Sequence, residues 1–290
     1  MIELVEVSPR DGLQNEPRVL PTDDKVELVR RAVLAGARRI EVASFVHPAK
    51  VPQMADAEAV IEALPRGDAR YVGLVLNKRG ALRALGTAID EIGVVCAASD
   101  TFGMRNQGMD VEQSLDMACD VLRFCQDQGR PAQVTIAVAF GCPFEGAVDP
   151  GKVVAMARRI AAAGAIEVAI ADTIGIARPD EVERLSAAVA AAIAPLPLRV
   201  HFHDTRGMGV ANAIAAVRAG AVTVDAAIGG TGGCPFAPGA AGNVASEDVA
   251  YAFGDAMQVD IARLVDTANW LNVRLGRERT SAVARAFASG

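Results

Sequence analysis

The residues best suited to chemistry by type and spacing are His201 and His203, which are separated by a single residue. On a β-strand, residues i and i+2 point to the same face, so the two imidazoles can converge on a metal ion. The alternative is a structural role, because a lone histidine near a strand end is more often simply hydrogen-bonded. Since the sequence holds only three histidines, we interpret this pair as half of a metal site.

A metal with two nitrogen ligands also needs oxygen donors, and Asp11 in the segment Arg10-Asp11-Gly12 is the best candidate. Mixed imidazole and oxygen ligation suits Mg²⁺ or Mn²⁺, whereas zinc is less favoured because no paired-cysteine motif is present. Arg10 supplies a cation beside this carboxylate. The structural alternative for Arg10 is an ion pair with Asp11 or Glu41 that only ties neighbouring strand ends together.

Residues 229–243 form the second unusual segment, with six glycines and two prolines. This composition predicts a loop rather than a helix or strand, and such a loop can close over a site as a lid. Cys234 at its centre is a potential proton donor or nucleophile. Asn243 ends the segment, where it is either a helix N-cap or a metal ligand through its amide oxygen.

Short β-branched runs alternate with longer amphipathic ones along the whole chain, which is typical of βα units around a parallel sheet. Eight units match a TIM (β/α)₈ barrel, whose active-site groups follow the strands. An open doubly wound sheet is the alternative, disfavoured because no G-x-G-x-x-G follows the first strand.

The recurring Ala-Gly-Ala at residues 35–37, 163–165 and 219–221 predicts glycine C-caps. We expect strands at 2–7, 39–43, 70–76, 91–97, 133–139, 166–171, 199–203 and 223–228, and helices at 23–34, 55–64, 79–85, 111–128, 150–163, 179–193, 209–219 and 244–253.

The composition excludes several classes of protein. Hydrophobic residues make up 51% and charged residues 22% of the 290 residues, which indicates a globular protein. Because no proline- or serine-rich linker is present and the eight units end before the last helical stretch, we expect one domain (1–290) with a C-terminal helical extension at 259–290. With aromatics at only 4%, we expect strands that read as continuous aliphatic runs. A net charge of -6 without a basic cluster argues against nucleic acid. No apolar run is long enough to cross a bilayer, which predicts no membrane span. The sequence shows no secretion signal and has five scattered cysteines, which predicts a cytoplasmic location.

Several motifs together resemble one family. They are S-P-R-D-G-L-Q-N-E (8–16), S-F-V-x-P-x-x-V-P-Q-M-A-D (44–56), G-C-P-F-E-G (141–146), A-D-T-I-G (171–175), H-F-H-D-T (201–205) and G-G-C-P-F-A-P-G-A-A-G-N (232–243). In this combination the sequence resembles the 3-hydroxy-3-methylglutaryl-CoA lyases, within the DRE-TIM superfamily of metal-dependent lyases and condensing enzymes. The cysteine of the last motif distinguishes the lyases from the isopropylmalate and homocitrate synthases.

The resemblance implies retro-Claisen cleavage of 3-hydroxy-3-methylglutaryl-CoA, or a closely related 3-hydroxyacyl-CoA, to acetyl-CoA and acetoacetate by a homodimer. A related aldolase or condensing enzyme, and a non-catalytic acyl-CoA-binding protein, are the alternatives. The proton of the substrate's 3-hydroxyl would go to His201, to Asp11 or to a metal-bound water. The phosphates of CoA need cations, for which Lys50, Arg79 and Arg105 are candidates. By matching motif, the metal ligands would be Asp11, His201, His203 and Asn243; the catalytic residues Arg10, Asp11, His201, Cys234, Glu41 and Asp172; and the substrate-binding residues Arg10, Gln14, Ser44 and Thr173.

Overall fold

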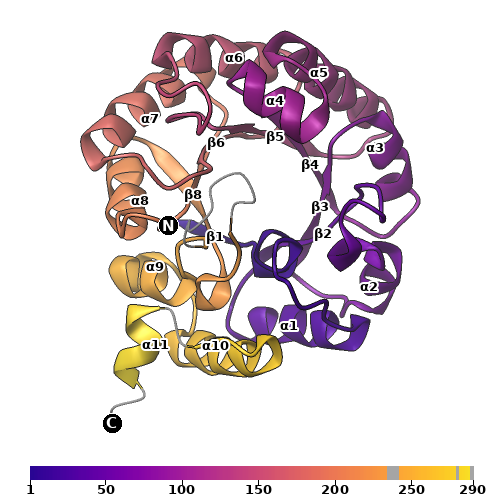
Figure 1. Cartoon of the computed structure of the whole chain (residues 1–290), viewed down its shortest axis with the longest axis vertical. Helices are drawn as coiled ribbons and strands as arrows, with labels where there is room; N and C mark the ends of the chain where they lie inside the picture. Colours follow the sequence, from indigo (N-terminus) through magenta and orange to yellow (C-terminus); the bar gives the residue numbers. More distant parts are fainter. Residues whose placement is uncertain (234–241, 279–280, 288–290) are drawn as a thin grey trace.

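The computed structural model describes residues 1–233, 242–278 and 281–287. Eight parallel strands close into a barrel in chain order, and helices surround it (Figure 1). Because the first strand pairs with the eighth, the TIM barrel is confirmed and the open doubly wound sheet is wrong. The strands are β1 (Glu3–Glu6), β2 (Arg39–Ser44), β3 (Arg70–Val75), β4 (Glu91–Ala97), β5 (Ala132–Ala137), β6 (Val168–Asp172), β7 (Leu198–Phe202) and β8 (Ala221–Ala226).

Each strand is followed by at least one helix on the outside of the barrel. The α-helices of the described residues are α1 (Thr22–Leu34), α2 (Ala57–Ala63), α3 (Lys78–Leu85), α4 (Asp100–Gln107), α5 (Val111–Asp127), α6 (Pro150–Ala162), α7 (Pro179–Ile193), α8 (Gly209–Arg218), α9 (Ser246–Phe253), α10 (Ile261–Leu275) and α11 (Ala282–Phe287). Short helical turns lie at η1 (Ser8–Gly12), η2 (Pro52–Met54), η3 (Ile228–Gly230) and η4 (Gly254–Ala256). The glycines of the three Ala-Gly-Ala segments have φ between 93° and 107°, which confirms the predicted left-handed C-caps.

Helix α4 was not expected from the sequence. The Ser99 hydroxyl accepts a hydrogen bond from the backbone of Phe102 at its start, and Gly108 ends it in a left-handed conformation. These are ordinary N-cap and C-cap signals. The helix covers one edge of the barrel mouth (Figure 1).

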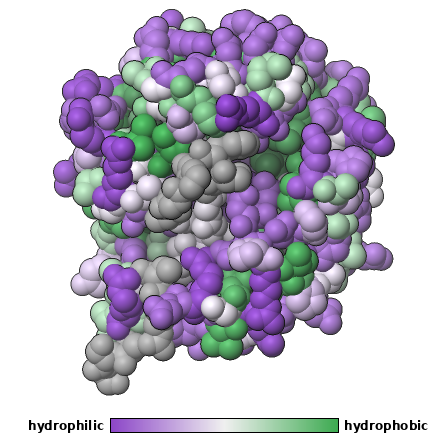
Figure 2. Space-filling model, in the orientation of Figure 1, coloured by the Kyte–Doolittle hydropathy of each residue, from purple (hydrophilic) through white to green (hydrophobic). Residues whose placement is uncertain are grey.

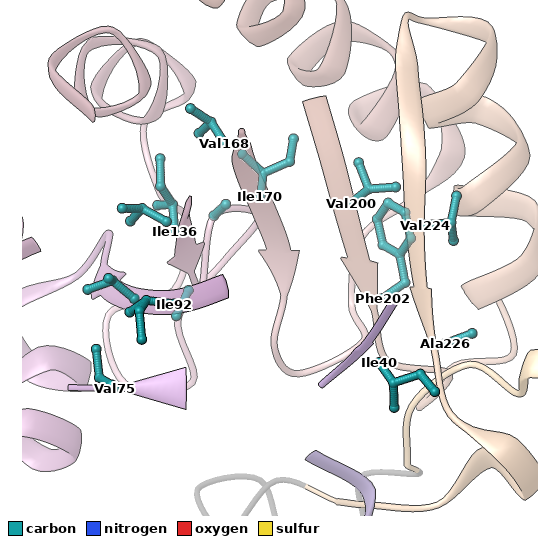
Figure 3. Packing of buried hydrophobic residues seen from close by; sticks show 14 of the residues in the cluster. Ile40, Val75, Ile92, Ile136, Val168, Ile170, Val200, Phe202, Val224 and Ala226 are labelled. Carbon is teal, nitrogen blue, oxygen red and sulfur yellow. The ribbon is translucent and has the colours of Figure 1, made fainter. Parts of the chain in front are cut away.

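The apolar core lies between the barrel and its helices. Side chains pointing outward from neighbouring strands form this layer (Figure 3), and they are completely or almost completely buried. Each fully buried aliphatic side chain of this kind contributes about 1.5–3 kcal/mol of transfer free energy. Examples are Ile40, Ile92, Ile136, Ile170, Val200, Phe202 and Val224.

The inside of the barrel is polar instead. Arg39 forms ion pairs with Glu91 and with Glu167, 2.8 Å away, and Arg199 lies between Glu167 and Asp225. Strands β2 (RIEVAS) and β7 (LRVHF) alternate between polar inward and apolar outward residues, whereas β3 (RYVGLV) and β6 (VAIAD) are apolar except at one end. The expectation of continuous aliphatic runs therefore holds for only some of the strands. The physical reason is that ion pairs, rather than aliphatic layers, fill this barrel.

The C-terminal helices pack beside the end of β8. Helix α10 contacts α1 and η3, and α11 contacts α9 and α10. Figure 1 shows these yellow and orange helices together at one side of the barrel. The extension thereby supports η3, the turn that leads from β8 towards residues 231–233.

Candidate metal centre and active site

The turn that carries Arg10 and Asp11 is fixed by a buried carboxylate, Glu6. Glu6 accepts hydrogen bonds from the Ser8 amide at 2.8 Å, the Ile228 amide at 3.0 Å and the Ser246 hydroxyl at 2.6 Å. Burial raises the pKa of Glu6 although these hydrogen bonds lower it. This carboxyl therefore ties the turn after β1 to the turn after β8 and to the first residue of α9.

Asp11, His201 and His203 converge at the carboxyl ends of β1 and β7. The Nε2 atoms of His201 and His203 lie 3.9 and 3.8 Å from the Asp11 carboxylate, and one donor atom from each residue fits within 4.8 Å of the others. Burial would raise the pKa of Asp11, but Arg10 and the two histidines hold it far below its ordinary value. The three side chains thus present one carboxylate and two imidazoles to a common point, as the sequence predicted for the two histidines.

Asn243 joins this group from the far end of the glycine-rich segment. Its amide nitrogen donates to Asp11 Oδ2 at 2.8 Å and to the Thr231 carbonyl at 3.0 Å. Its Oδ1 atom is buried and has no hydrogen-bond partner among the described residues, which is costly unless a further group satisfies it. Helix α9 begins later, with Ala245 at the N-cap, so the N-cap alternative for Asn243 is wrong.

A carboxylate that the sequence analysis did not single out, Asp225, orients His201. Asp225 Oδ2 lies 3.1 Å from His201 Nδ1. Burial alone would raise the pKa of Asp225, but the Arg199 charge and the His201 contact outweigh burial and hold the pKa below its ordinary value. Asp225 is therefore ionised. Nδ1 then carries the ring proton and Nε2 is left as the ligand atom. No local pattern in the sequence marks Asp225, because its partner His201 lies on the neighbouring strand β7.

Arg10 contacts two carboxylates at once. Its Nη1 lies 2.5 Å from Asp11 Oδ1, and its Nε pairs with Glu41 on β2. Burial lowers the pKa of Arg10, but the charges of Glu41 and Asp11 outweigh it and raise the pKa. The ion pair that the sequence offered as a structural alternative is present. Because Arg10 and Glu41 also line the cavity described next, this ion pair lies within reach of a ligand.

The metal donors open into a cavity of about 150 Å³ at the barrel mouth. Figure 2 shows this face hollowed near its centre, where hydrophobic and hydrophilic residues meet. Around the donors, its wall is formed by Gln14, Asn15, Leu74, Phe102, Asn106, Thr135, Ala137, Ala171, Thr173, Arg199 and Gly233.

The predicted substrate-binding and positioning residues divide into two groups. Gln14 and Thr173 line the cavity, whereas Ser44 is buried behind it and its hydroxyl donates to Gln14 at 3.1 Å. Asp172 is turned away: its carboxylate accepts from the amides of Ile176 at 3.1 Å and Ala177 at 2.8 Å. Asp172 therefore shapes the loop after β6, and a direct catalytic role is not supported by its contacts.

Cys234 lies outside the described residues. The other cysteines, Cys96, Cys119, Cys125 and Cys142, are buried free thiols, and burial raises the pKa of Cys96, Cys119 and Cys125. These three are therefore poor nucleophiles. Their burial indicates that they pack as small apolar side chains.

The donor set fits a divalent cation. A carboxylate, two imidazoles and an amide oxygen without a partner are suitable ligands for such an ion. Residues 1–272 match the HMGL-like family. The chain belongs to the HMGL-like family.

Relatives of this HMGL-like chain are similar along nearly its whole length. It is 38% identical to the mitochondrial hydroxymethylglutaryl-CoA lyase of Arabidopsis thaliana, over 99% of this chain and 62% of that protein. It therefore spans less than two thirds of that relative. It is 40% identical to the (R)-citramalyl-CoA lyase of Chloroflexus aurantiacus, over 98% of this chain and 94% of that protein.

A solved structure shares the fold of the HMGL-like chain. The HMG-CoA lyase from Acinetobacter baumannii, in complex with coenzyme A and 3-methylmalate, superposes with a TM-score of 0.94 at 38% identity, over 99% of this chain and 95% of that one. These similarities confirm the expected class, the carbon–carbon lyases of the hydroxymethylglutaryl-CoA lyase type. Within the described residues, no helix is long and apolar enough to cross a membrane.

Proposed function

We propose that this protein cleaves 3-hydroxy-3-methylglutaryl-CoA, or a closely related 3-hydroxyacyl-CoA, to acetyl-CoA and an oxo acid, which is acetoacetate for the named substrate. The observation that carries the proposal is the convergence of Asp11, His201 and His203, with Asn243 Oδ1 unpartnered among the described residues, beside Arg10. In this reaction the 3-hydroxyl loses its proton, the C2–C3 bond breaks, and its electron pair passes to the thioester as an enolate. The enolate then takes a proton at C2.

The four donors Asp11, His201, His203 and Asn243 would hold the cation, for which we propose Mg²⁺ or Mn²⁺. When bound, the cation supplies positive charge that acidifies the substrate hydroxyl and fixes its orientation. Asp225 keeps the His201 ring turned for this task.

Arg10 supplies the second positive charge. Glu41 and Asp11 engage its Nε and Nη1. Its Nη2 has no such partner among the described residues and can donate to the enolate oxygen as negative charge develops there. A fixed donor of this kind is usually among the largest contributions to catalysis. Glu41 acts as a positioning residue because it holds the guanidinium in place. We assign the return of a proton to C2 to Cys234, as the sequence motif implies.

A groove beside the cavity suits the nucleotide end of coenzyme A. It shares Val46, Leu76 and Asn106 with the cavity and carries the cations Lys50 and Arg79. These two are among the cations that the sequence suggested for the phosphates. The third, Arg105, instead lies 4.1 Å above the ring of Phe144.

The experiment is to incubate the purified, metal-loaded protein with 3-hydroxy-3-methylglutaryl-CoA and with citramalyl-CoA, and to measure acetyl-CoA by mass spectrometry. We expect acetyl-CoA from at least one thioester, and its loss in Asp11→Asn but not in the exposed control Asp120→Asn. Condensation of acetyl-CoA with 2-oxo acids, without cleavage, would favour the condensing enzyme. Binding of both thioesters without turnover would favour the non-catalytic alternative.

We also propose that residues 1–290 form one catalytic domain with 259–290 as its helical extension, and that the protein is a homodimer. Light scattering of the purified protein tests the second statement. A monomer mass at micromolar concentration would contradict it.

A further inference from the structure

Residues 231–233 and 242–243, which we call the stem, carry the two ends of the glycine-rich segment. A Cβ atom on Gly232 would lie 2.7 Å from Asn243 Nδ2, a distance that no side chain tolerates, so only glycine permits this approach. The backbone amide of Asn243 also donates to the Thr231 carbonyl at 3.3 Å. The two sides of the stem therefore pack directly against each other.

The inner side of the stem borders the metal donors and the cavity. The same Cβ atom on Gly232 would lie 3.3 Å from the Asp11 carbonyl, and Gly233 lines the cavity. Cys234, to which we assign the return of the proton, follows Gly233 directly in the chain. The position of the stem therefore sets where Cys234 begins relative to the cavity.

The outer side of the stem is held by two residues that follow the Arg10-Asp11 turn. The Asn15 amide nitrogen donates to the Gly233 carbonyl at 2.9 Å, and the Glu16 carboxylate accepts from the Gly232 amide at 3.4 Å. Glu16 is itself fixed, because its carbonyl accepts from Gln53 Nε2 at 2.7 Å and its side chain is buried. The carboxylate that meets the stem therefore belongs to the barrel framework.

The C-terminal extension reaches the same carboxylate. Arg277 follows the end of α10, where its backbone amide donates to the Asn272 carbonyl at 2.9 Å. Its guanidinium forms an ion pair with Glu16 through Nη1. A charge-assisted contact to a buried carboxylate is stronger than an exposed ion pair. Because Glu16 also accepts from Gly232, this ion pair connects the extension to the stem.

We propose that Glu16 and Arg277 are positioning residues of the lyase site, whose ion pair holds the stem so that Cys234 begins at the mouth of the cavity. The inference rests on the proposed function, in which Cys234 returns the proton, and deepens it by giving the C-terminal extension a part in that step. Neither residue touches the substrate, because both act through Gly232 and Gly233.

A purely structural role for the ion pair makes a different prediction. If the pair only fastened the extension, its loss would lower thermal stability and leave the reactivity of Cys234 unchanged. If the pair positions the stem, its loss changes the reactivity of Cys234 at temperatures where the protein stays folded. The four other cysteines are buried free thiols, so alkylation of Cys234 can be followed separately from theirs.

The test measures how fast iodoacetamide alkylates Cys234 in the Mn²⁺-loaded protein without substrate, by mass spectrometry of its peptide. In Arg277→Met the rate should rise on the order of 10-fold, because a charge-assisted contact no longer opposes local opening of the stem. Glu16→Gln should have the same effect, and it serves if the first variant does not fold. The double variant should react no faster than the faster single variant, since both changes remove one contact.

The matched control is Arg274→Met, which breaks a different ion pair of the same helix. Arg274 Nε lies 3.5 Å from Asp24 on α1, and this pair does not involve the stem. The control should keep the alkylation rate of the wild type. Arg277→Lys, which preserves the charge, should restore most of the protection that Arg277→Met loses.

Turnover separates this inference from the proposed function. With 3-hydroxy-3-methylglutaryl-CoA, kcat should fall in Arg277→Met, while the Kd for Mn²⁺ changes less than about threefold because Asn243 keeps its hydrogen bond to Asp11. If the wild type cleaves no thioester, only the proposed function fails, since the alkylation rates need no turnover. Unchanged alkylation in Arg277→Met and Glu16→Gln, an equal rise in Arg274→Met, or faster alkylation with an unchanged kcat would overturn the inference.

Discussion

Replacing Asp225 by Asn tests whether the buried carboxylate behind His201 prepares it to bind a metal. The Asp225 oxygen lies 3.1 Å from His201 Nδ1, and its pKa is lowered mainly by Arg199 and His201 against the effect of burial. The contact is thus a hydrogen bond to an ionised group, of about 1.5–3 kcal/mol. This corresponds to roughly 10- to 100-fold in affinity, the range found when partners of metal-binding histidines are removed.

The assay is a titration of the metal-free Asp225→Asn variant with Mn²⁺, followed by electron paramagnetic resonance of the free ion. We expect a Kd for Mn²⁺ about 10- to 100-fold weaker than in the wild type. The matched control is Asp172→Asn, a buried carboxylate at the end of β6, next to the strand of His201, that accepts loop amides at 2.8 and 3.1 Å. This control should lose thermal stability and keep its Mn²⁺ affinity. An Asp225→Asn variant that folds and binds Mn²⁺ as tightly as the wild type would refute the reasoning.

Three further predictions follow from other residues. His203→Ala and Asn243→Ala should both weaken Mn²⁺ binding, because each removes a donor next to Asp11; unchanged titrations would contradict this. Cys234→Ala should keep its Mn²⁺ affinity and slow the release of acetyl-CoA, and a loss of metal would contradict that division of roles. Burial raises the pKa of Glu247 from 4.5 to about 7. Between these two pH values the folded state keeps a proton on Glu247 that the unfolded state releases. The free energy of unfolding therefore falls as the pH rises from 4.5 through 7. Glu247→Gln should therefore stabilise the protein at pH 8 by up to about 3 kcal/mol, with little effect at pH 4.5, as measured by urea unfolding; equal effects at both pH values would exclude the mechanism.

The fold could be predicted because its signals are local. Period and turn residues separate the strands from the helices, and the polar residues at the strand ends indicate where the site lies. The same-face rule for His201 and His203 needed only the strand period. Asp11 required the barrel itself, since β1 and β7 are brought together only when β8 lies between them.

What the sequence did not reveal depends on contacts across the barrel. Asp172 has the right type and place for catalysis, yet its carboxylate is used by amides of its own loop. Asp225 and Arg199 were overlooked because each sits inside a strand that we expected to be aliphatic. Only the closed barrel shows that both point inward, towards His201. The partner of a buried charge is a tertiary property, and composition does not report it.

The most direct test of the central claim measures bound Mn²⁺ and released acetyl-CoA in the same samples as metal-free protein is titrated. With 3-hydroxy-3-methylglutaryl-CoA as substrate, we predict that one ion binds per chain, that activity rises in proportion to occupancy, and that Asp11→Asn abolishes both. Full activity in thoroughly metal-free protein, or full Mn²⁺ occupancy in the Asp11→Asn variant, would contradict the account.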